Sequence, residues 1–113
     1  MPNPKHMFNL HFKQFKNIEN LEEDSITDCT VFEYFQYGNK IWGNYEGGKI
    51  SQGTLRGFKT SENSFELEYS HINSKGELKT GKYDTEVAFT KEGKLILSEF
   101  WKWNKKKSTL IEV

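Results

Sequence analysis

The feature of this sequence that most restricts its fold is a series of short turn-forming clusters along the chain. The clusters are rich in glycine, asparagine, serine and lysine, and they occupy residues 37–40, 46–49, 61–64, 73–76, 91–94 and 104–107. Glycine and asparagine tolerate the positive φ that tight hairpin turns require. The intervals between clusters suit single strands joined by hairpins better than strands joined by crossover helices.

Two of these intervals alternate between polar and apolar residues in the way of a strand with one buried face. The residues that share one face are Phe65, Leu67, Tyr69, His71 and Asn73 in the first, and Leu95, Leu97, Glu99, Trp101 and Trp103 in the second. A period of two is the repeat of a β-strand. The run from Cys29 to Tyr37 is apolar on both faces, so its inward face stays open.

A small antiparallel barrel is the fold that these strands favour. The 113 residues suffice for a single domain with one core. We expect a first strand through Phe8, Leu10 and Phe12, and an acidic loop or one helical turn from Asn17 to Thr27. Consecutive antiparallel strands must protect their edges, and an up-and-down barrel of about eight strands does so by closing. A two-sheet β-sandwich is the alternative.

Four segments of the chain resemble a known family. Residues 45–50 (YEGGKI), 53–57 (GTLRG), 69–81 (YSHINSKGELKTG) and 99–103 (EFWKW) are similar to small bacterial proteins of about this length, often named N-acetylglutamate synthase. The resemblance runs from about Thr30 onward and implies a lipocalin- or avidin-like barrel. The Arg/Gln-x-x-Gly-x-Gly/Ala loop of acetyl-CoA-binding enzymes, which holds pyrophosphate at a helix N-terminus, is not found here. The resemblance therefore implies a fold rather than an activity.

Composition and motif spacing argue against several classes of function. Sixteen Lys and Arg residues balance sixteen Asp and Glu residues, so no net charge favours a nucleic acid or a membrane surface. A single cysteine, Cys29, allows no internal disulfide, and the three histidines lack the spacing of a metal site. The start of the chain lacks the apolar stretch of a signal peptide. We expect a cytoplasmic protein that binds no nucleic acid, membrane, metal or cofactor.

The two alternating runs place polar groups on faces that are otherwise aromatic. If both faces point inward, the predicted ligand-binding residues are Tyr69, His71, Asn73, Glu99, Trp101 and Trp103. Apolar walls with a few polar groups are typical of small-molecule sites. Because an isolated buried carboxylate is costly, Glu99 needs a partner, for which His71, Arg56 or a cation on the ligand could serve.

Three hypotheses for the function follow. The leading one is a non-enzymatic protein that binds a small organic ligand inside the barrel. The second is a small enzyme that uses Glu99 and His71 as general acid and base. The third is a structural or interaction protein in which an open sheet edge pairs across a homodimer. A barrel filled by its own side chains is the alternative to any internal site.

Overall fold

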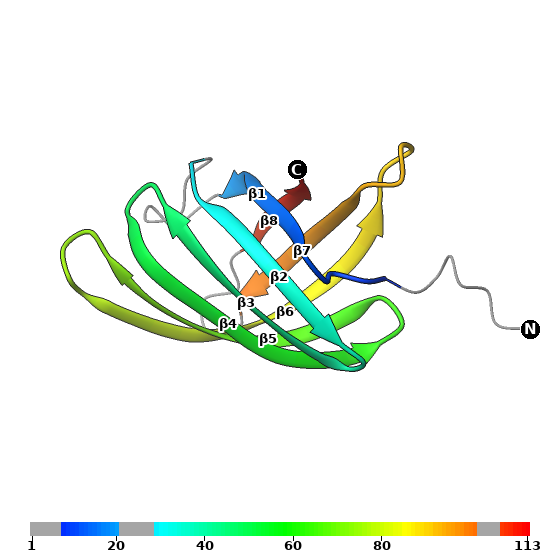
Figure 1. The fold of residues 1–113 in the computed structure, drawn as a ribbon, viewed down its shortest axis with the longest axis horizontal. Coiled ribbons are helices and arrows are strands. Elements are labelled where there is room, and N and C mark those ends of the chain that lie inside the picture. The colour runs from blue at the N-terminus through cyan, green and yellow to red at the C-terminus, as the bar shows by residue number, and fades with distance from the viewer. Residues whose placement is uncertain (1–7, 21–28, 102–106) are drawn as a thin grey trace, which may run out of the picture.

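The fold is that of a computed structural model, which describes residues 8–20, 29–101 and 107–113. These residues form an antiparallel sheet whose strands follow chain order (Figure 1). The strands are β1 (Lys13–Asn20), β2 (Val31–Tyr37), β3 (Lys40–Gly47), β4 (Ile50–Ser61), β5 (Ser64–Asn73), β6 (Leu78–Phe89), β7 (Leu95–Trp101) and β8 (Lys107–Glu112). The described residues contain no helix long and apolar enough to span a membrane.

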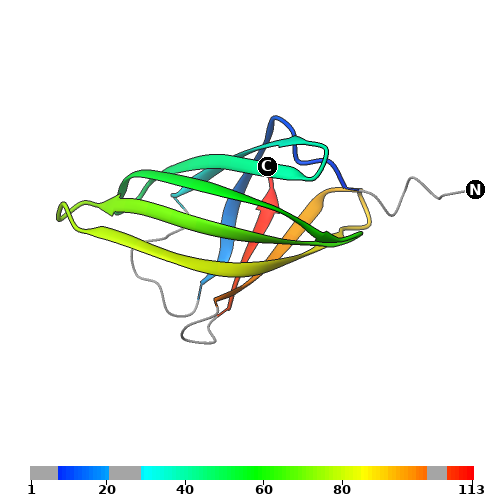
Figure 2. The ribbon, with the colours of Figure 1, turned by 90° about the horizontal axis from the view of Figure 1, so that it is seen from below.

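The sheet closes on itself because β1 pairs with both β2 and β8. Lys13 lies opposite Tyr34 of β2, and Phe15 lies opposite Glu112 of β8. The two views in Figures 1 and 2 show the strands wrapping around a common interior. Closure confirms the predicted eight-stranded up-and-down barrel over the β-sandwich. Since each described strand is paired on both sides, no open edge remains among them for the edge-paired homodimer.

Five of the six predicted turn clusters lie at hairpins of the barrel, between β2 and β7. Gly48 and Gly93, in the β3–β4 and β6–β7 hairpins, have φ of 63° and 86°. Side chains other than glycine are strained in this region, which explains why glycine marks the turns. The sixth cluster, at 104–107, lies outside the described residues except for Lys107, which begins β8.

The chain before β1 differs from the prediction. Phe8, Leu10 and Phe12 do not form a strand, and β1 begins only at Lys13. The chain turns at Phe12, where φ is 62° and the ring is exposed, so the alternation of apolar residues there does not reflect an extended strand. Phe8 and Leu10 are nevertheless buried, and the rings of Phe8 and Phe65 lie 5.6 Å apart. This segment covers one end of the barrel.

The acidic loop predicted from Asn17 to Thr27 also begins later than expected. β1 continues to Asn20, because pairing with β8 extends the strand through Asn17, which lies opposite Leu110. The side chain of Asn17 is buried in the barrel. The rest of the predicted loop, at residues 21–27, lies outside the described part of the chain.

The buried side chains divide into two regions, which we call the plugged end and the polar end. The plugged end lies toward the β2–β3, β4–β5 and β6–β7 hairpins, and its apolar residues include Phe8, Leu10, Phe15, Ile41, Phe65, Leu67, Leu97 and Leu110. The polar end lies toward the β3–β4 and β5–β6 hairpins, and its buried polar residues are Asn17, Thr30, Tyr45, His71, Asn73, Thr85, Glu99 and Ser108.

The structure also decides the orientation of β2, which the sequence left open. Phe32 and Tyr34 point into the barrel, whereas Val31 and Tyr37 are exposed. The ring of Tyr34 packs edge-on against Phe15, at 5.3 Å between centroids. Tyr34 therefore lies where the plugged end meets the polar end.

Candidate functional site

Four of the six predicted site residues are buried inside the barrel. Tyr69, His71 and Asn73 project inward from β5, and Glu99 projects inward from β7. Their common orientation follows from the alternation of each strand. The main chain of Trp101 ends β7 opposite Tyr83. The structure does not describe the side chain of Trp101. Trp103 lies outside the described residues altogether.

Glu99 is almost completely buried and only partly hydrogen-bonded. The hydroxyl of Ser108, its neighbour on β8, donates to Oε1 at 3.4 Å. Oε2 has no hydrogen-bond partner among the residues that the structure describes. Burial raises the pKa of Glu99 to about 8, although the nearby hydroxyls of Tyr83, Ser108 and Tyr34 oppose part of this rise. The Tyr34 hydroxyl does so by its proximity, without the geometry of a hydrogen bond. The carboxyl group is therefore mostly protonated at neutral pH.

Three hydroxyl groups that sequence reasoning did not select accompany Glu99. Tyr34 comes from β2, and Tyr83 and Thr85 come from β6, where Thr85 lies opposite Glu99. Burial, and next the nearby Glu99 carboxyl, raise the pKa values of Tyr34 and Tyr83 well above the ordinary range. Both phenols thus remain neutral hydrogen-bonding groups. The hydroxyl oxygens of Tyr34 and Thr85 have no hydrogen-bond partner within the described part of the chain.

A second polar group is centred on His71. The hydroxyl of Tyr45, on β3, lies 2.7 Å from Nδ1 of His71. The rings of Tyr69 and His71 stack at 5.8 Å between centroids. His71 is therefore positioned by aromatic neighbours, whereas Glu99 is surrounded by hydroxyl groups. The two members of the hypothetical acid–base pair have different immediate neighbours.

Two glycines make room for the tyrosine rings of the polar end. Gly53 lies opposite Tyr45, and Gly81 lies opposite Tyr69. A Cβ atom at Gly53 would lie 2.5 Å from the nearest atom of the Tyr45 ring, and one at Gly81 would lie 2.6 Å from the Tyr69 ring. Each ring thus lies against the bare backbone of the neighbouring strand. The alternation pattern did not reveal these pairs, because it contains no information about register.

Asn73 is buried, but its side chain serves the turn between β5 and β6. Its Oδ1 accepts hydrogen bonds from the main-chain nitrogens of Lys75 and Glu77, and its Nδ2 donates to the carboxylate of Glu77. This last bond is also the main reason that the pKa of Glu77 is lowered. Asn73 therefore stabilises the hairpin beside the site.

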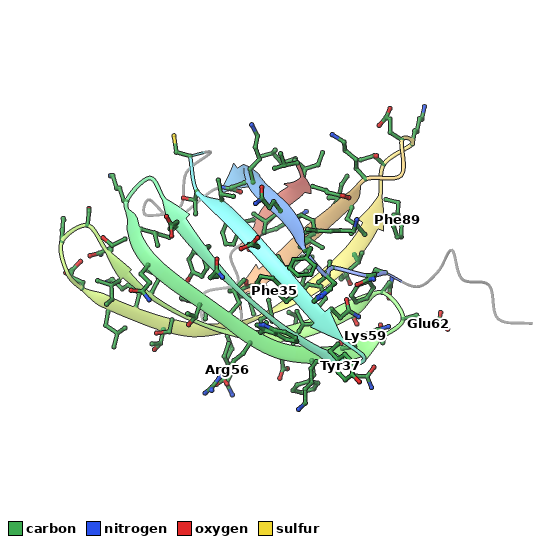
Figure 3. The ribbon with its side chains drawn as sticks, viewed as in Figure 1. Phe35, Tyr37, Arg56, Lys59, Glu62 and Phe89 are labelled. Carbon is green, nitrogen blue, oxygen red and sulfur yellow. The ribbon has the colours of Figure 1, made fainter. Side chains whose placement is uncertain are left out.

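Arg56 is not a partner of Glu99. Its side chain points away from the barrel (Figure 3), and its Nε lies 3.8 Å from the carboxylate of Glu68 on the outer face. Residues on a strand alternate between the two faces, and Leu55 takes the inward position beside it. Cys29 is exposed, and no group of three metal-ligating side chains occurs within the described ranges.

Comparison with known proteins agrees with the barrel. Searches of curated proteins and of solved structures gave no match. Residues 8–113 match the family model described as avidin-like protein. This match supports the lipocalin- or avidin-like fold expected from the sequence and lends no support to an acetyltransferase activity. A match over nearly the whole chain, together with the closed eight-stranded antiparallel barrel, shows that the protein belongs to the avidin-like family.

Proposed function

We propose that this protein binds a small organic ligand at the polar end of its barrel interior, without catalysing a reaction. The observation that carries the proposal is a set of three buried polar atoms with no hydrogen-bond partner in the described chain: Oε2 of Glu99, the hydroxyl oxygen of Tyr34 and Oγ1 of Thr85. Barrels of eight strands are wide enough either to be filled by side chains or to hold one small ligand. Membership of the avidin-like family agrees with the second case.

The energetic cost of these polar atoms supports a binding role. Leaving a buried donor or acceptor unsatisfied costs about 1–3 kcal/mol per group. A folded domain is stable by only about 5–15 kcal/mol in total. Phenylalanine at Tyr34 and valine at Thr85 would fill the same space without that cost. A ligand that accepts and donates hydrogen bonds there offers a reason for the polar residues.

The proposed site combines predicted residues with residues that only the fold brings together. Tyr69, His71, Trp101 and Trp103 are proposed to line it, and Glu99 is proposed to orient the ligand. Tyr34, Tyr83 and Thr85 join this set because their hydroxyl groups share the interior with Glu99. Asn73 is proposed to act indirectly, through the turn that it holds.

Native mass spectrometry of freshly purified protein tests this proposal, together with tryptophan fluorescence during a screen of small metabolites. We expect either a co-purified ligand mass or fluorescence quenching by one of the metabolites. The double variant Tyr34→Phe/Thr85→Val should lower the affinity for that ligand at least tenfold. The matched control is Thr54→Val, since Thr54 is exposed on the outer face of β4. A clean apo mass and silent fluorescence across the screen would contradict the proposal and favour a barrel filled by its own side chains.

A further inference from the structure

The described part of the barrel interior contains a buried carboxyl group but no buried lysine or arginine. Glu99 is buried, with 2% of its surface exposed, and one carboxyl oxygen lacks a hydrogen-bond partner within the described ranges. No lysine or arginine is among the buried residues of the described chain. Arg56, the only arginine in the sequence, is paired with Glu68 outside the barrel. In the described part of the chain, Glu99 therefore faces hydroxyl groups and no lysine or arginine.

Aromatic rings are also buried in the interior that contains this carboxyl group. The buried tyrosines are Tyr34, Tyr45, Tyr69 and Tyr83. The rings of Tyr69 and Tyr83 lie 5.9 Å apart, and Phe32 stacks on Tyr45 at 4.8 Å. The faces of aromatic rings carry negative partial charge and attract organic cations, an attraction that strengthens when the cation is desolvated. A carboxyl group and tyrosine rings thus occur together in a region shielded from water.

We propose that the ligand is an organic ammonium ion whose positive charge lies against Glu99 and whose carbon atoms contact the tyrosine rings. This inference rests on the proposed function and assigns the chemical class of its ligand. An ammonium ion can pair with the carboxylate that forms when Glu99 loses its proton. A neutral or anionic ligand would instead bind beside the protonated carboxyl group and would release no proton.

Binding of such a cation includes the loss of one proton. Glu99, protonated in the free protein, releases its proton to solvent, and the resulting carboxylate forms an ion pair with the ammonium group. Among the described residues, the groups that face Glu99 are the hydroxyls of Tyr34, Tyr83, Thr85 and Ser108. The raised pKa values of Tyr34 and Tyr83 prevent these phenols from ionising instead. His71 shares the interior, where its Nδ1 lies beside the Tyr45 hydroxyl.

Proton release on binding distinguishes an ammonium ligand from a neutral ligand, which would release no proton. Because the pKa of Glu99 is about 8, cation affinity should fall by about tenfold per unit as the pH drops below 8. Above that pH the affinity should level off. A quaternary ammonium ion is the suitable probe, since it has no proton of its own to lose.

The experiment compares choline with 3,3-dimethylbutan-1-ol, a neutral molecule of nearly the same shape. Isothermal titration calorimetry from pH 6 to 9, in buffers with different ionisation enthalpies, gives both the affinity and the number of protons released. We expect choline to bind more tightly than the alcohol and to release nearly one proton at pH 7. Glu99→Gln should abolish this release and weaken choline binding about thirtyfold or more at pH 9. The control Glu86→Gln, on the outer face of β6, should change neither quantity.

The two proposals can fail separately. If the alcohol binds as tightly as choline, or if neither probe binds at 10 mM, the assignment to an ammonium ion is overturned. A co-purified neutral or acidic metabolite seen by native mass spectrometry would overturn it as well, while the binding function would remain. An empty barrel in both experiments would overturn the binding function itself.

Discussion

The plugged end and the polar end of the barrel obey the same alternation but differ in what it buries. At the plugged end, Phe8 and Leu10 enter from outside the sheet and pack with apolar side chains such as Phe65. At the polar end, the inward positions of the same strands bear hydroxyl, imidazole and carboxyl groups. Apolar burial contributes most to folding, whereas buried polar groups with missing partners oppose it. The difference indicates that the plugged end contributes most of the stability, and it agrees with the proposal that the polar end binds a ligand.

The largest effect is expected from opening a cavity at the plugged end. Phe15 is fully buried and packs against Tyr34. Replacement by alanine should reduce the free energy of unfolding by about 3–5 kcal/mol, through lost burial and the cavity that remains. Urea denaturation followed by circular dichroism measures this loss. Phe58→Ala is the control, because Phe58 is exposed on β4; an equal loss there would contradict the division between the two ends.

The next effect concerns the pH dependence of stability. Glu99 has a folded-state pKa of about 8, above its ordinary value of 4.5. Between these values the unfolded chain has lost its proton while the folded protein keeps it. The free energy of unfolding should therefore fall by a few kcal/mol as the pH rises from about 4.5 to about 8 and should change little beyond.

Glu99→Gln should remove this decline and make the protein more stable than the wild type at pH 8 to 9. Urea titrations at several pH values provide the measurement. Glu86→Gln should leave the wild-type slope unchanged, since Glu86 is exposed. A slope that survives in Glu99→Gln would mean that another group titrates in this range.

A smaller effect is expected where the backbone makes room for a tyrosine ring. In Gly53→Ala, the new methyl group would collide with the ring of Tyr45. We expect a loss of about 1–3 kcal/mol in stability from the overpacking. The contact between Tyr45 and His71 should also be disturbed, which nitrogen-15 NMR of the imidazole ring can detect. An unchanged His71 spectrum would show that the ring can move aside without affecting its partner.

The smallest effect separates satisfied from unsatisfied hydroxyl groups within the polar end. Tyr34→Phe removes a hydroxyl with no hydrogen-bond partner in the described chain and should leave stability unchanged or raise it by about 1 kcal/mol. Tyr45→Phe removes the hydroxyl beside His71 and should lower stability by about 1 kcal/mol. Thermal unfolding of the two variants side by side tests the difference. Equal losses would mean that both hydroxyl groups are equally well bonded.

Much of the barrel could be predicted because its determinants are local. Turn residues at five hairpins and the alternation in β5 and β7 depend only on neighbours in the chain. The same alternation correctly placed Tyr69, His71 and Glu99 in the interior. The prediction of a first strand through Phe8, Leu10 and Phe12 was wrong. The same apolar spacing is compatible with a segment that turns at Phe12, with Phe8 and Leu10 buried and Phe12 exposed.

The sequence by itself determined the positions of five hairpin turns, the inward faces of β5 and β7 and the presence of a buried carboxyl group. Only the tertiary structure decided that β1 meets β8, that residues 8–12 cover one end, and that Tyr34 lies near Glu99. Alternation specifies which side of a strand a residue occupies, but not which strand lies across the barrel from it. Closure and register set that relation by long-range pairing, and they place the hydroxyls of β2, β6 and β8 around Glu99.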